Sequence, residues 1–364
     1  MTSFVVRIGE VLAQNNPPLA IDILPGDVSA WIPEDSDCQF LLQEGNLGIP
    51  HKVLLRGYIE AVSIFLRSKK ALSSIPVAIE EHKDLYAQLT HSTSVILIAN
   101  PAHQTALNVR KRLIAMGLID AQRELRVMAA ILSTREGAKQ SILWHHRRWL
   151  LRRLHPANGE YTIDEDDDED TLCSYAIPTN ALQIELSLST QASETYPRNY
   201  FAWNHRYRCI STLVNIHEAA SERTALRTIV LQEILQTRKW IELHISDYSA
   251  MQYYCRLSNI LQKSSSDDIA PVEFTPLEHA TALLLRYPEH ESLWVYFRSA
   301  WLLSTYAETG SIPAAVSRLM FCDPKLLSGL LPEKKLAVEN HAQRLQSFMD
   351  RTGSDILRKL HNNL

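Results

Sequence analysis

The sequence predicts an all-α protein built from about five tandem helical hairpins. Glycine contributes only 11 of the 364 residues, which leaves little for glycine-rich turns or phosphate-binding loops and favours helices. Apolar residues make up 46% of the chain, as in an ordinary folded protein. The motif Trp-x-His-Arg occurs at Trp144–Arg147 and again at Trp203–Arg206, each time after a helical segment and a short polar break. A motif that recurs between helical segments is typical of a repeat array.

Composition and charge exclude several classes of protein. The net charge of −4 excludes a globally basic nucleic-acid-binding protein. The five cysteines are scattered without a Cys-x-x-Cys pair, so we expect reduced thiols in a cytoplasmic protein and no metal site on this chain. Arg7 and Glu10 interrupt the first apolar run, and the longest such run, near Val95–Ala99, is far below the roughly 20 residues that span a bilayer. We therefore expect no signal peptide and no membrane insertion.

Residues 1–80 are expected to form a lead-in with one or two helices. A short helix is predicted around Phe4–Gln14, and a loop rich in proline, glycine and aspartate follows it and carries Trp31. The apolar spacing between His51 and Lys70 suits a second helix.

Residues 81–364 form the predicted repeat domain. Proline at Pro101 can begin a helix at its first turn, and Gly117 is a good C-terminal cap. A terminal segment, Lys334–Leu360, is expected to form one or two helices with a possible break at Gly353. The expected helix pairs are 85–99 with 107–114, 121–132 with 141–151, 176–191 with the Trp203 helix, 224–243 with 250–261, and 277–287 with 294–301.

Equivalent positions in the five pairs are 37, 59, 48 and 43 residues apart, which is the spacing of helix-hairpin arrays. They are Leu107, Trp144, Trp203, Met251 and Trp294. The long spacing of 59 has a visible cause, because a disordered insertion at about residues 156–175 contains seven consecutive acidic residues, Asp164–Asp170. A solvated spacer is the favoured interpretation, and shielding of the basic stretch Arg147–Arg153 is the alternative.

The recurring motif has two interpretations. On a helix, Trp144, Arg147, Arg148 and Leu151 share one broad face, with His146 beside it. The histidines are either general bases or ligands, or they are hydrogen-bonded packing residues. Recurrence favours packing, since a protein rarely needs the same catalytic group in every repeat. The predicted joint residues between hairpins are Trp144, His146, Arg147, Trp203, His205, Arg206, Trp294 and Arg298.

Several segments resemble a known family. The stretch Pro197-Arg-Asn-Tyr-Phe-Ala-Trp-Asn-His-Arg206 resembles the repeat of protein prenyltransferase α subunits, and Pro288–Trp294 resembles the last repeat of that family. Asn100–Ile114 and Ser141–Leu151 are most similar to the α-subunit repeat-containing branch of the family, which also has a long N-terminal lead-in. The resemblance covers about residues 80–305.

The resemblance implies a right-handed superhelical crescent, similar to a tetratricopeptide array, that wraps around a catalytic β subunit. In the family, the β subunit holds zinc and the isoprenoid diphosphate, so no cofactor is expected on this chain. The branch resembles the α-like subunit of a type III geranylgeranyltransferase. It is expected to pair with the Rab-type geranylgeranyltransferase β subunit and to act in geranylgeranyl transfer to a cysteine near the C-terminus of a protein substrate.

The resemblance also implies residue roles. Lys139 stands five residues before Trp144, where a lysine of the family contacts the diphosphate, and an ammonium group there offsets charge that grows in the transition state. Tyr200 matches a catalytic tyrosine, while Arg198 and Asn199 are expected to line the diphosphate mouth. Ile142 stands where tetrapeptide-reading enzymes have a carboxylate-binding glutamine, which favours the Rab-type partner. Two other departures are Ser141, in place of a tyrosine, and Phe201, in place of a histidine.

Three rival interpretations remain. The first is a non-catalytic helical-repeat scaffold that binds a different protein, which the loss of tryptophan at Leu107 and Met251 favours. The second is the α subunit of farnesyltransferase, which Ile142 and the long lead-in disfavour. The third is nucleic-acid binding through Arg147–Arg153, which the net acidic charge disfavours.

Overall fold

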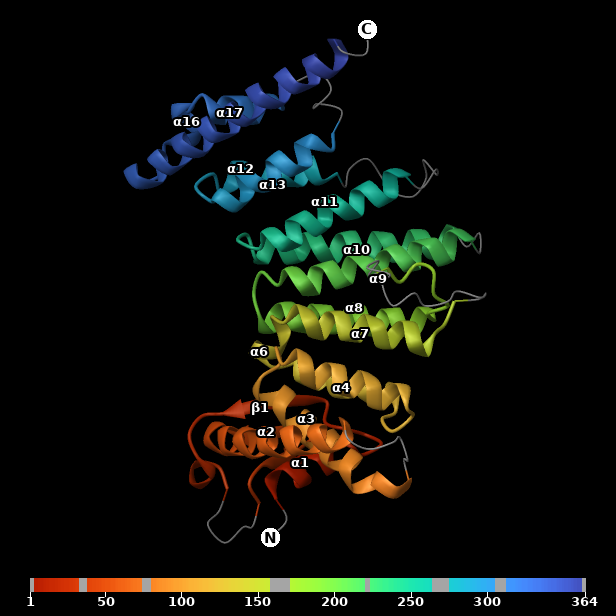
Figure 1. Ribbon diagram of the computed structural model, residues 1–364. Helices are drawn as coiled ribbons and strands as arrows, with labels where there is room; N and C mark the ends of the chain where they lie inside the picture. Colours follow the sequence, from red (N-terminus) through yellow and green to blue (C-terminus); the bar gives the residue numbers. More distant parts are fainter. Residues whose placement is uncertain are drawn as a thin grey trace. The chain divides into compact units, whose positions relative to one another are not determined.

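The computed structural model describes residues 3–32, 38–73, 80–157, 171–219, 223–263, 275–304 and 312–361. The chain divides into two compact units, residues 1–209 (unit 1) and 210–364 (unit 2), and the boundary falls inside helix α9, Tyr200–Ala219 (Figure 1). The predicted acidic run Asp164–Asp170 lies outside the described residues. Each unit is helical, which confirms the predicted all-α class apart from one small sheet near the N-terminus.

That sheet corrects the sequence prediction, which placed only a loop after the first helix. Helix α1 spans Phe4–Leu12, and strands β1 (Ala20–Leu24), β2 (Leu41–Gln43) and β3 (Asn46–Pro50) follow it. The strand order is β1-β3-β2, with β1 parallel and β2 antiparallel to β3. Strands of three to five residues are too short for an alternating pattern to stand out.

The turn between β2 and β3 was equally hard to recognise. It consists of Glu44 and Gly45, both with positive φ, 51° and 79°, as a two-residue type I′ hairpin requires. Asparagine or aspartate is the usual first residue of such a turn, and glutamate gave no signal in the sequence.

The lead-in packs against the repeat helices of unit 1. The backbone N–H of Ile21 in β1 donates to the hydroxyl of Ser133, at 3.0 Å. Two arginines of the repeats donate to carbonyls after α1, Arg123 to Ala13 at 2.8 Å and Arg126 to Asn15 at 2.9 Å. Strand β1 and the segment after α1 therefore pack onto the first repeats.

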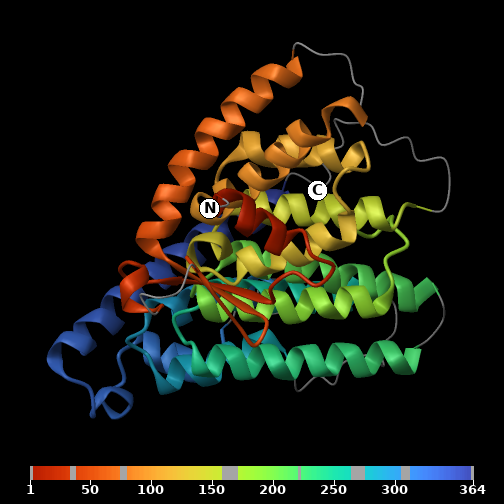
Figure 2. The same ribbon diagram turned by 90° about the horizontal axis from the view of Figure 1, so that it is seen from below.

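The repeat helices of unit 1 form three hairpins, α3 with α4, α5 with α7, and α8 with α9. Their bounds are α2 His51–Ser73, α3 Lys83–Ala99, α4 Gln104–Ala115, α5 Ala121–Leu132, α6 Arg135–Ala138, α7 Ser141–Leu154 and α8 Thr179–Thr195. Figure 2 shows α2, the long lead-in helix, as one uninterrupted orange helix.

One boundary and one short helix in unit 1 differ from the prediction. Helix α4 begins at Gln104 rather than at Pro101, because the ring of His103 accepts a hydrogen bond from the N–H of Ala106 at 3.1 Å and caps the helix. The single-turn helix α6 was not predicted. The expected cap at Gly117 is confirmed by its φ of 76°.

Unit 2 continues with further hairpins, α10 with α11 and α12 with α13, and ends in three helices. Their bounds are α10 Arg223–Leu243, α11 Tyr248–Lys263, α12 Pro276–Arg286, α13 Glu291–Leu302, α15 Ala314–Met320, α16 Pro324–Leu327 and α17 Pro332–His361. Helix α17 passes through Gly353 without interruption, so the predicted break there is wrong. The short helices α15 and α16 were not predicted.

Buried ion pairs join successive hairpins in unit 1. The guanidinium of Arg147 in α7 binds both carboxylate oxygens of Glu185 in α8, at 2.5 and 2.7 Å, and His205 in α9 contacts the same carboxylate at 2.8 Å. One hairpin earlier, Arg110 in α4 and His146 in α7 bind Glu124 in α5 in the same way. We call each set an Arg–Glu–His joint.

Each joint arginine also binds the first helix of its own hairpin. Arg110 donates to the carbonyl of Thr90 at 3.2 Å, Arg147 to that of Leu125 at 2.6 Å, and Arg206 to that of Leu186 at 2.7 Å. Arg110 and Arg147 thus hold their own hairpin and the next hairpin through one planar side chain. Lysine could not replace either of them without loss of contacts.

The recurring tryptophan fixes the turn inside a hairpin. The indole N–H of Trp144 donates to the carbonyl of Ala138 at 3.1 Å, and that of Trp294 in unit 2 donates to the carbonyl of Pro288 at 2.6 Å. In both cases the acceptor lies six residues earlier. Met251 has no such donor, and there the carboxylate of Asp247 accepts from the N–H groups of Ser249 and Ala250 instead.

Burial and charge set the protonation of the joints. Burial raises the pKa of Glu124 and Glu185, but the neighbouring Arg110 and Arg147 outweigh it and hold both pKa values at about 2. Burial lowers the pKa of His146 and His205 below the ordinary 6.5. At neutral pH each joint therefore consists of a cationic arginine, an anionic glutamate and a neutral histidine.

Replacing Glu185 by alanine is expected to destabilise unit 1 by about 3–5 kcal/mol, because Arg147 and His205 then stay buried without their acceptor. Thermal unfolding followed by circular dichroism measures the change. Glu194→Ala, on an exposed site of the same helix, is the matched control and should shift stability by less than about 0.5 kcal/mol. Equal effects of the two substitutions would contradict the role of the joint.

Lowering the pH should reduce the stability of the protein in two stages. The unfolded chain takes up protons on His146 and His205 below pH 6.5, while the folded chain does not, so stability falls in that range. Glu124 and Glu185 stabilise the fold fully above pH 4.5, and this contribution is lost as the pH falls toward 2. Urea unfolding between pH 8 and 2 measures both stages. A midpoint that stays constant down to pH 5 would contradict the first.

Candidate functional site

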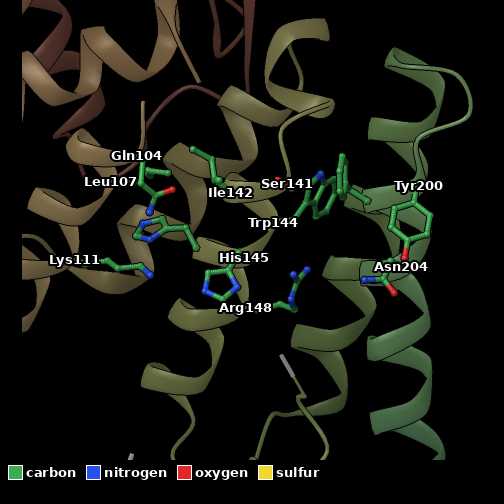
Figure 3. A pocket seen from close by; sticks show the side chains of 12 residues that line it. Gln104, Leu107, Lys111, Ser141, Ile142, Trp144, His145, Arg148, Tyr200 and Asn204 are labelled. Atoms are coloured by element: carbon green, nitrogen blue, oxygen red, sulfur yellow. The ribbon is translucent and has the colours of Figure 1, made fainter. Parts of the chain in front are cut away.

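A pocket of about 340 Å³ opens in unit 1 along the second helices of its three hairpins, α4, α7 and α9 (Figure 3). Twelve residues line it: Gln104, Leu107, Lys111, Ser141, Ile142, Trp144, His145, His146, Arg148, Tyr200, Phe201 and Asn204. The position held by tryptophan in the strong repeats contributes Leu107 and Trp144, so the repeat geometry itself builds the pocket.

The pocket has an apolar part and a cationic part. Leu107 and Trp144, which are fully buried, together with Ile142 and Phe201 supply the apolar surface. Lys111, His145 and Arg148 supply basic nitrogen atoms, and in Figure 3 these three side chains lie in a row. The pocket thus combines apolar surface with basic nitrogen atoms.

The three predicted departures from the family pattern, Ser141, Ile142 and Phe201, all line this pocket. Ser141 and Ile142 begin helix α7 and line the pocket beside Tyr200 and Phe201 at the start of α9. Tyr200 is 52% exposed, and its ring contacts Phe201 edge-on at 5.6 Å. Of the residues assigned a catalytic role from sequence, Tyr200 is therefore the one that lines the pocket.

Lys139 lies in the turn ahead of the pocket. It follows the single-turn helix α6, and its ammonium group pairs with Glu136 at 2.7 Å, with the two side chains 35% and 62% exposed. It is not one of the lining residues. Such a solvent-exposed pair contributes at most about 1 kcal/mol, so it holds Lys139 only loosely.

The backbone of that turn is held firmly. The carbonyl of Ala138 accepts hydrogen bonds from Trp144 at 3.1 Å and from the side-chain amide of Asn199 at 2.8 Å. Asn199 is 1% exposed, and its oxygen also caps α9 by accepting from the N–H of Ala202 at 3.1 Å. Asn199 therefore links the turn that carries Lys139 to the turn that carries Tyr200.

Arg198 occupies the left-handed region of backbone conformation, with φ of 60°, and its side chain is exposed. A left-handed residue before a capping asparagine turns the chain sharply into α9. This places Arg198 and Tyr200 on either side of the buried Asn199, where both reach solvent.

The predicted joint residues are interior. Trp144, His146, Arg147, Trp203, His205, Arg206 and Trp294 are all buried, at 5% exposure or less, while Arg298 is half-buried against the ring of Phe348, 4.9 Å away. His146 and His205 each bind a glutamate, and burial lowers the pKa of both. These contacts support the packing interpretation of the two histidines.

Sequence reasoning missed Lys111, His145 and Asn204 as pocket residues, and it assigned Arg148 to packing. A usable signal exists in the repeat register. Lys111 and Arg148 follow the tryptophan position by four residues, and His145 and Asn204 follow it by one. On a helix, the positions one and four residues after the tryptophan position are three residues apart and therefore share a face. The repeat register thus predicts that these four residues lie on the same side of the second helices.

Within the described ranges, no group of three or more histidine, cysteine, aspartate or glutamate residues is placed to hold a metal ion. No helix in the described part of the chain is long and apolar enough to cross a membrane. The described residues do not fit a zinc site, so no step of the chemistry of this chain is assigned to zinc.

Removal of the Asn199 amide is expected to destabilise unit 1 by about 1–3 kcal/mol, since Asn199→Ala leaves the carbonyl of Ala138 and the N–H of Ala202 without this partner. Thermal unfolding measures the loss. Tyr200→Ala, at the neighbouring half-exposed site, should change stability far less. A smaller effect at Asn199 than at Tyr200 would contradict the linking role of the amide.

Comparison with known proteins agrees with the motif analysis. Residues 182–213, which cover most of α8 and the first part of α9, match the model of the family described as protein prenyltransferase alpha subunit repeat. This segment contains Glu185, Trp203, His205 and Arg206.

Relatives extend the similarity beyond this segment. The chain is 28% identical over 243 residues to protein prenyltransferase alpha subunit repeat-containing protein 1 of Danio rerio, which covers 59% of this chain and 54% of that protein. It is 26% identical over 261 residues to the protein of the same name from Homo sapiens, with 62% and 61% covered. The similar stretch thus spans little more than half the length of these relatives.

A more distant similarity is to geranylgeranyl transferase type-2 subunit alpha of Homo sapiens, 25% identical over 228 residues, which covers 58% of this chain and 33% of that protein. The repeat match and these relatives confirm the resemblance that the tryptophan motifs predicted: residues 182–213 match the repeat of the protein prenyltransferase α subunits, and a longer stretch is similar to proteins named for that repeat.

Proposed function

We propose that this chain is the α-type subunit of a heterodimeric protein prenyltransferase that acts with a Rab-type β subunit. The observation that carries the proposal is the α-subunit repeat at residues 182–213, whose Glu185 and His205 take part in the same joint that recurs at Glu124 and His146. The similarity to geranylgeranyl transferase type-2 subunit alpha supports a geranylgeranyl donor and a cysteine near the C-terminus of a protein substrate as acceptor.

Exposed aromatic side chains support a partner surface. Tyr200 in unit 1 and Tyr248 in unit 2 hold the same repeat position, the first residue of a second helix, and each is 52% exposed. Aromatic residues are enriched at protein interfaces because they bury a large surface with little loss of conformational freedom. In each unit, a partner that covers the start of the second helix would bury the tyrosine there.

The chemistry proposed for this chain is assistance to leaving-group departure. Zinc and geranylgeranyl diphosphate are placed on the β subunit in this proposal, and the chain supplies positive charge beside the departing diphosphate. Lys139 is proposed to do so, since its exposed pair with Glu136 can open at small cost. Tyr200, Arg198 and Asn199 are proposed to border the same mouth, with Asn199 as a positioning residue.

Co-expression with a Rab-type β subunit tests the partner. We expect the two chains to co-purify as a stable complex and to transfer geranylgeranyl to protein substrates that neither chain modifies alone. Replacement of both exposed tyrosines, Tyr200 and Tyr248, by alanine should weaken the complex without unfolding the chain. Failure of the wild-type chains to co-purify would favour the alternative of a non-catalytic scaffold.

Lys139→Ala tests the contribution to chemistry. In the purified complex, we expect the single-turnover transfer rate to fall by about tenfold or more, because a positive charge beside the leaving group is lost. Lys139→Arg should keep most of the rate. Glu136→Gln, which removes the pairing carboxylate and leaves the lysine, is the matched control and should not lower it. Full activity of Lys139→Ala would contradict the role of this lysine.

A further inference from the structure

A second cavity of unit 1 lies where the lead-in meets the repeats. Its volume is about 650 Å³, compared with about 340 Å³ for the pocket along α4, α7 and α9. Strand β1, the start of α2 and the ends of α3, α5 and α8 surround it, together with α6 (Figure 1). A cavity of this size can take a small ligand or a few residues of a peptide. We call it the lead-in pocket, and among its lining residues are Ile23, Leu54, Leu55, Tyr58, Ile98 and Glu136.

One wall of the lead-in pocket is an open strand edge. In the described part of the chain, β1 pairs with β3 on one side and with no strand on the other. The N–H of Ile21 points away from β3, since it donates to the hydroxyl of Ser133 at 3.0 Å. Backbone groups of alternate strand residues point the same way, so the N–H and C=O of Ile23 also lie on this edge. Neither group has a hydrogen-bond partner among the residues that the structure describes.

The face of the sheet beside this edge is apolar. Side chains two residues apart on a strand share a face, and Ile21 is buried, so Ile23 faces the same interior side. Ile23 is nevertheless 37% exposed, because it borders the cavity. A residue placed opposite Ile23 on the open edge would direct its side chain to this face. It would meet the buried Leu54 and Ile98 and the half-exposed Leu55 there.

The charged side chains of the lead-in pocket are mixed in sign. Asp22 and Glu136 are acidic, while His51 and Arg135 are basic. The carboxylate of Glu136 is paired with the ammonium group of Lys139 at 2.7 Å. The lining therefore favours neither a strongly anionic nor a strongly cationic ligand, and an uncharged, apolar group suits it best.

We propose that the lead-in pocket binds a short extended peptide. The backbone of the peptide pairs with the N–H and C=O of Ile23, and an apolar side chain of the peptide enters between Leu54, Leu55 and Ile98. Extended peptides add to exposed sheet edges in this way: the main-chain hydrogen bonds give affinity, and pockets for alternate side chains give specificity. A donor and an acceptor on one strand residue, next to an apolar cavity, match a peptide on both counts.

The assignment of this peptide to the protein substrate rests on the proposed function. Glu136 lines the lead-in pocket and pairs with Lys139, which is proposed to assist the departure of the diphosphate. A substrate whose acceptor cysteine reaches Lys139 can therefore place the residues before that cysteine in the pocket. The lead-in then takes part in the choice of protein substrate.

Fluorescence anisotropy of the full 364-residue chain tests the proposal with labelled peptides of about nine residues, in which threonine alternates with leucine, isoleucine, valine or phenylalanine. We expect saturable binding of at least one of them, and none of a peptide in which threonine alternates with aspartate. Ile23→Pro removes the open N–H at a strand edge, where proline is tolerated, and should weaken binding about tenfold or more. Ile23→Val keeps the N–H and should bind within a few-fold of the wild-type chain.

A matched pair of substitutions on α2 tests the side-chain part of the site. Leu55→Glu places a charge in the lead-in pocket and should weaken binding about tenfold or more. Ile59→Glu is the control, because Ile59 lies one turn further along the same helix, is 62% exposed and does not line the cavity. Equal losses in the two variants, or no saturable binding of any apolar peptide by the wild-type chain, would overturn the proposal.

Hydrogen exchange gives a readout that needs no substitution. Peptide binding should slow the exchange of the amide of Ile23, which makes no hydrogen bond within the described structure. Peptide binding without slower exchange in the segment 20–24 would contradict pairing at the strand edge. The melting temperature of each variant shows that it has remained folded, and this measurement decides the matter if Ile23→Pro does not fold.

The outcome is independent of the β subunit. If the chain co-purifies with a β subunit but binds no apolar peptide, the lead-in pocket proposal fails while the proposed function stands. If a peptide binds with the expected dependence on Ile23 and Leu55 and no β subunit associates, the peptide site stands and the proposed function fails.

Discussion

The arginine–glutamate fork between successive hairpins is the interaction on which unit 1 depends. Each fork buries two opposite charges at almost full exclusion from water, and such a pair is stable only when every polar atom has a partner. The carbonyls of Thr90 and Leu125 and the imidazoles of His146 and His205 supply most of those partners. A shift of one hairpin against the next would break the Arg110–Glu124 and Arg147–Glu185 pairs, so the fork fixes the register.

That register determines which side chains remain available for function. The joint turns the tryptophan and arginine positions inward, and the positions one and four residues after the tryptophan then face the pocket. Lys111 meets His145 and Arg148 there for this reason, although it precedes His145 by 34 residues in the sequence. The repeat thus uses one face of its second helix for cohesion and presents an adjacent face to ligands or partners.

The turns are tied to the same framework. Trp144 and Asn199, from successive hairpins, both donate to the carbonyl of Ala138, one residue before Lys139. A residue of the predicted mouth, Asn199, is therefore buried and acts on its neighbours through the backbone. The side chains of Arg198 and Tyr200 beside it are exposed, and Lys139 is held by a solvent-exposed ion pair.

The sequence alone determined the helical class, the order of the hairpins and the joint residues, because these depend on local periodicity and on a motif that recurs every few dozen residues. It also favoured packing over catalysis for Trp144–Arg147. Only the tertiary structure revealed the small sheet, whose strands are too short to show a pattern, and Glu124 and Glu185 as the acceptors of the arginines. It alone brought Lys111 and Arg148 into one pocket. Which glutamate an arginine meets, and which cations share a pocket, depends on the stacking of one hairpin on the next, and no local spacing encodes that contact.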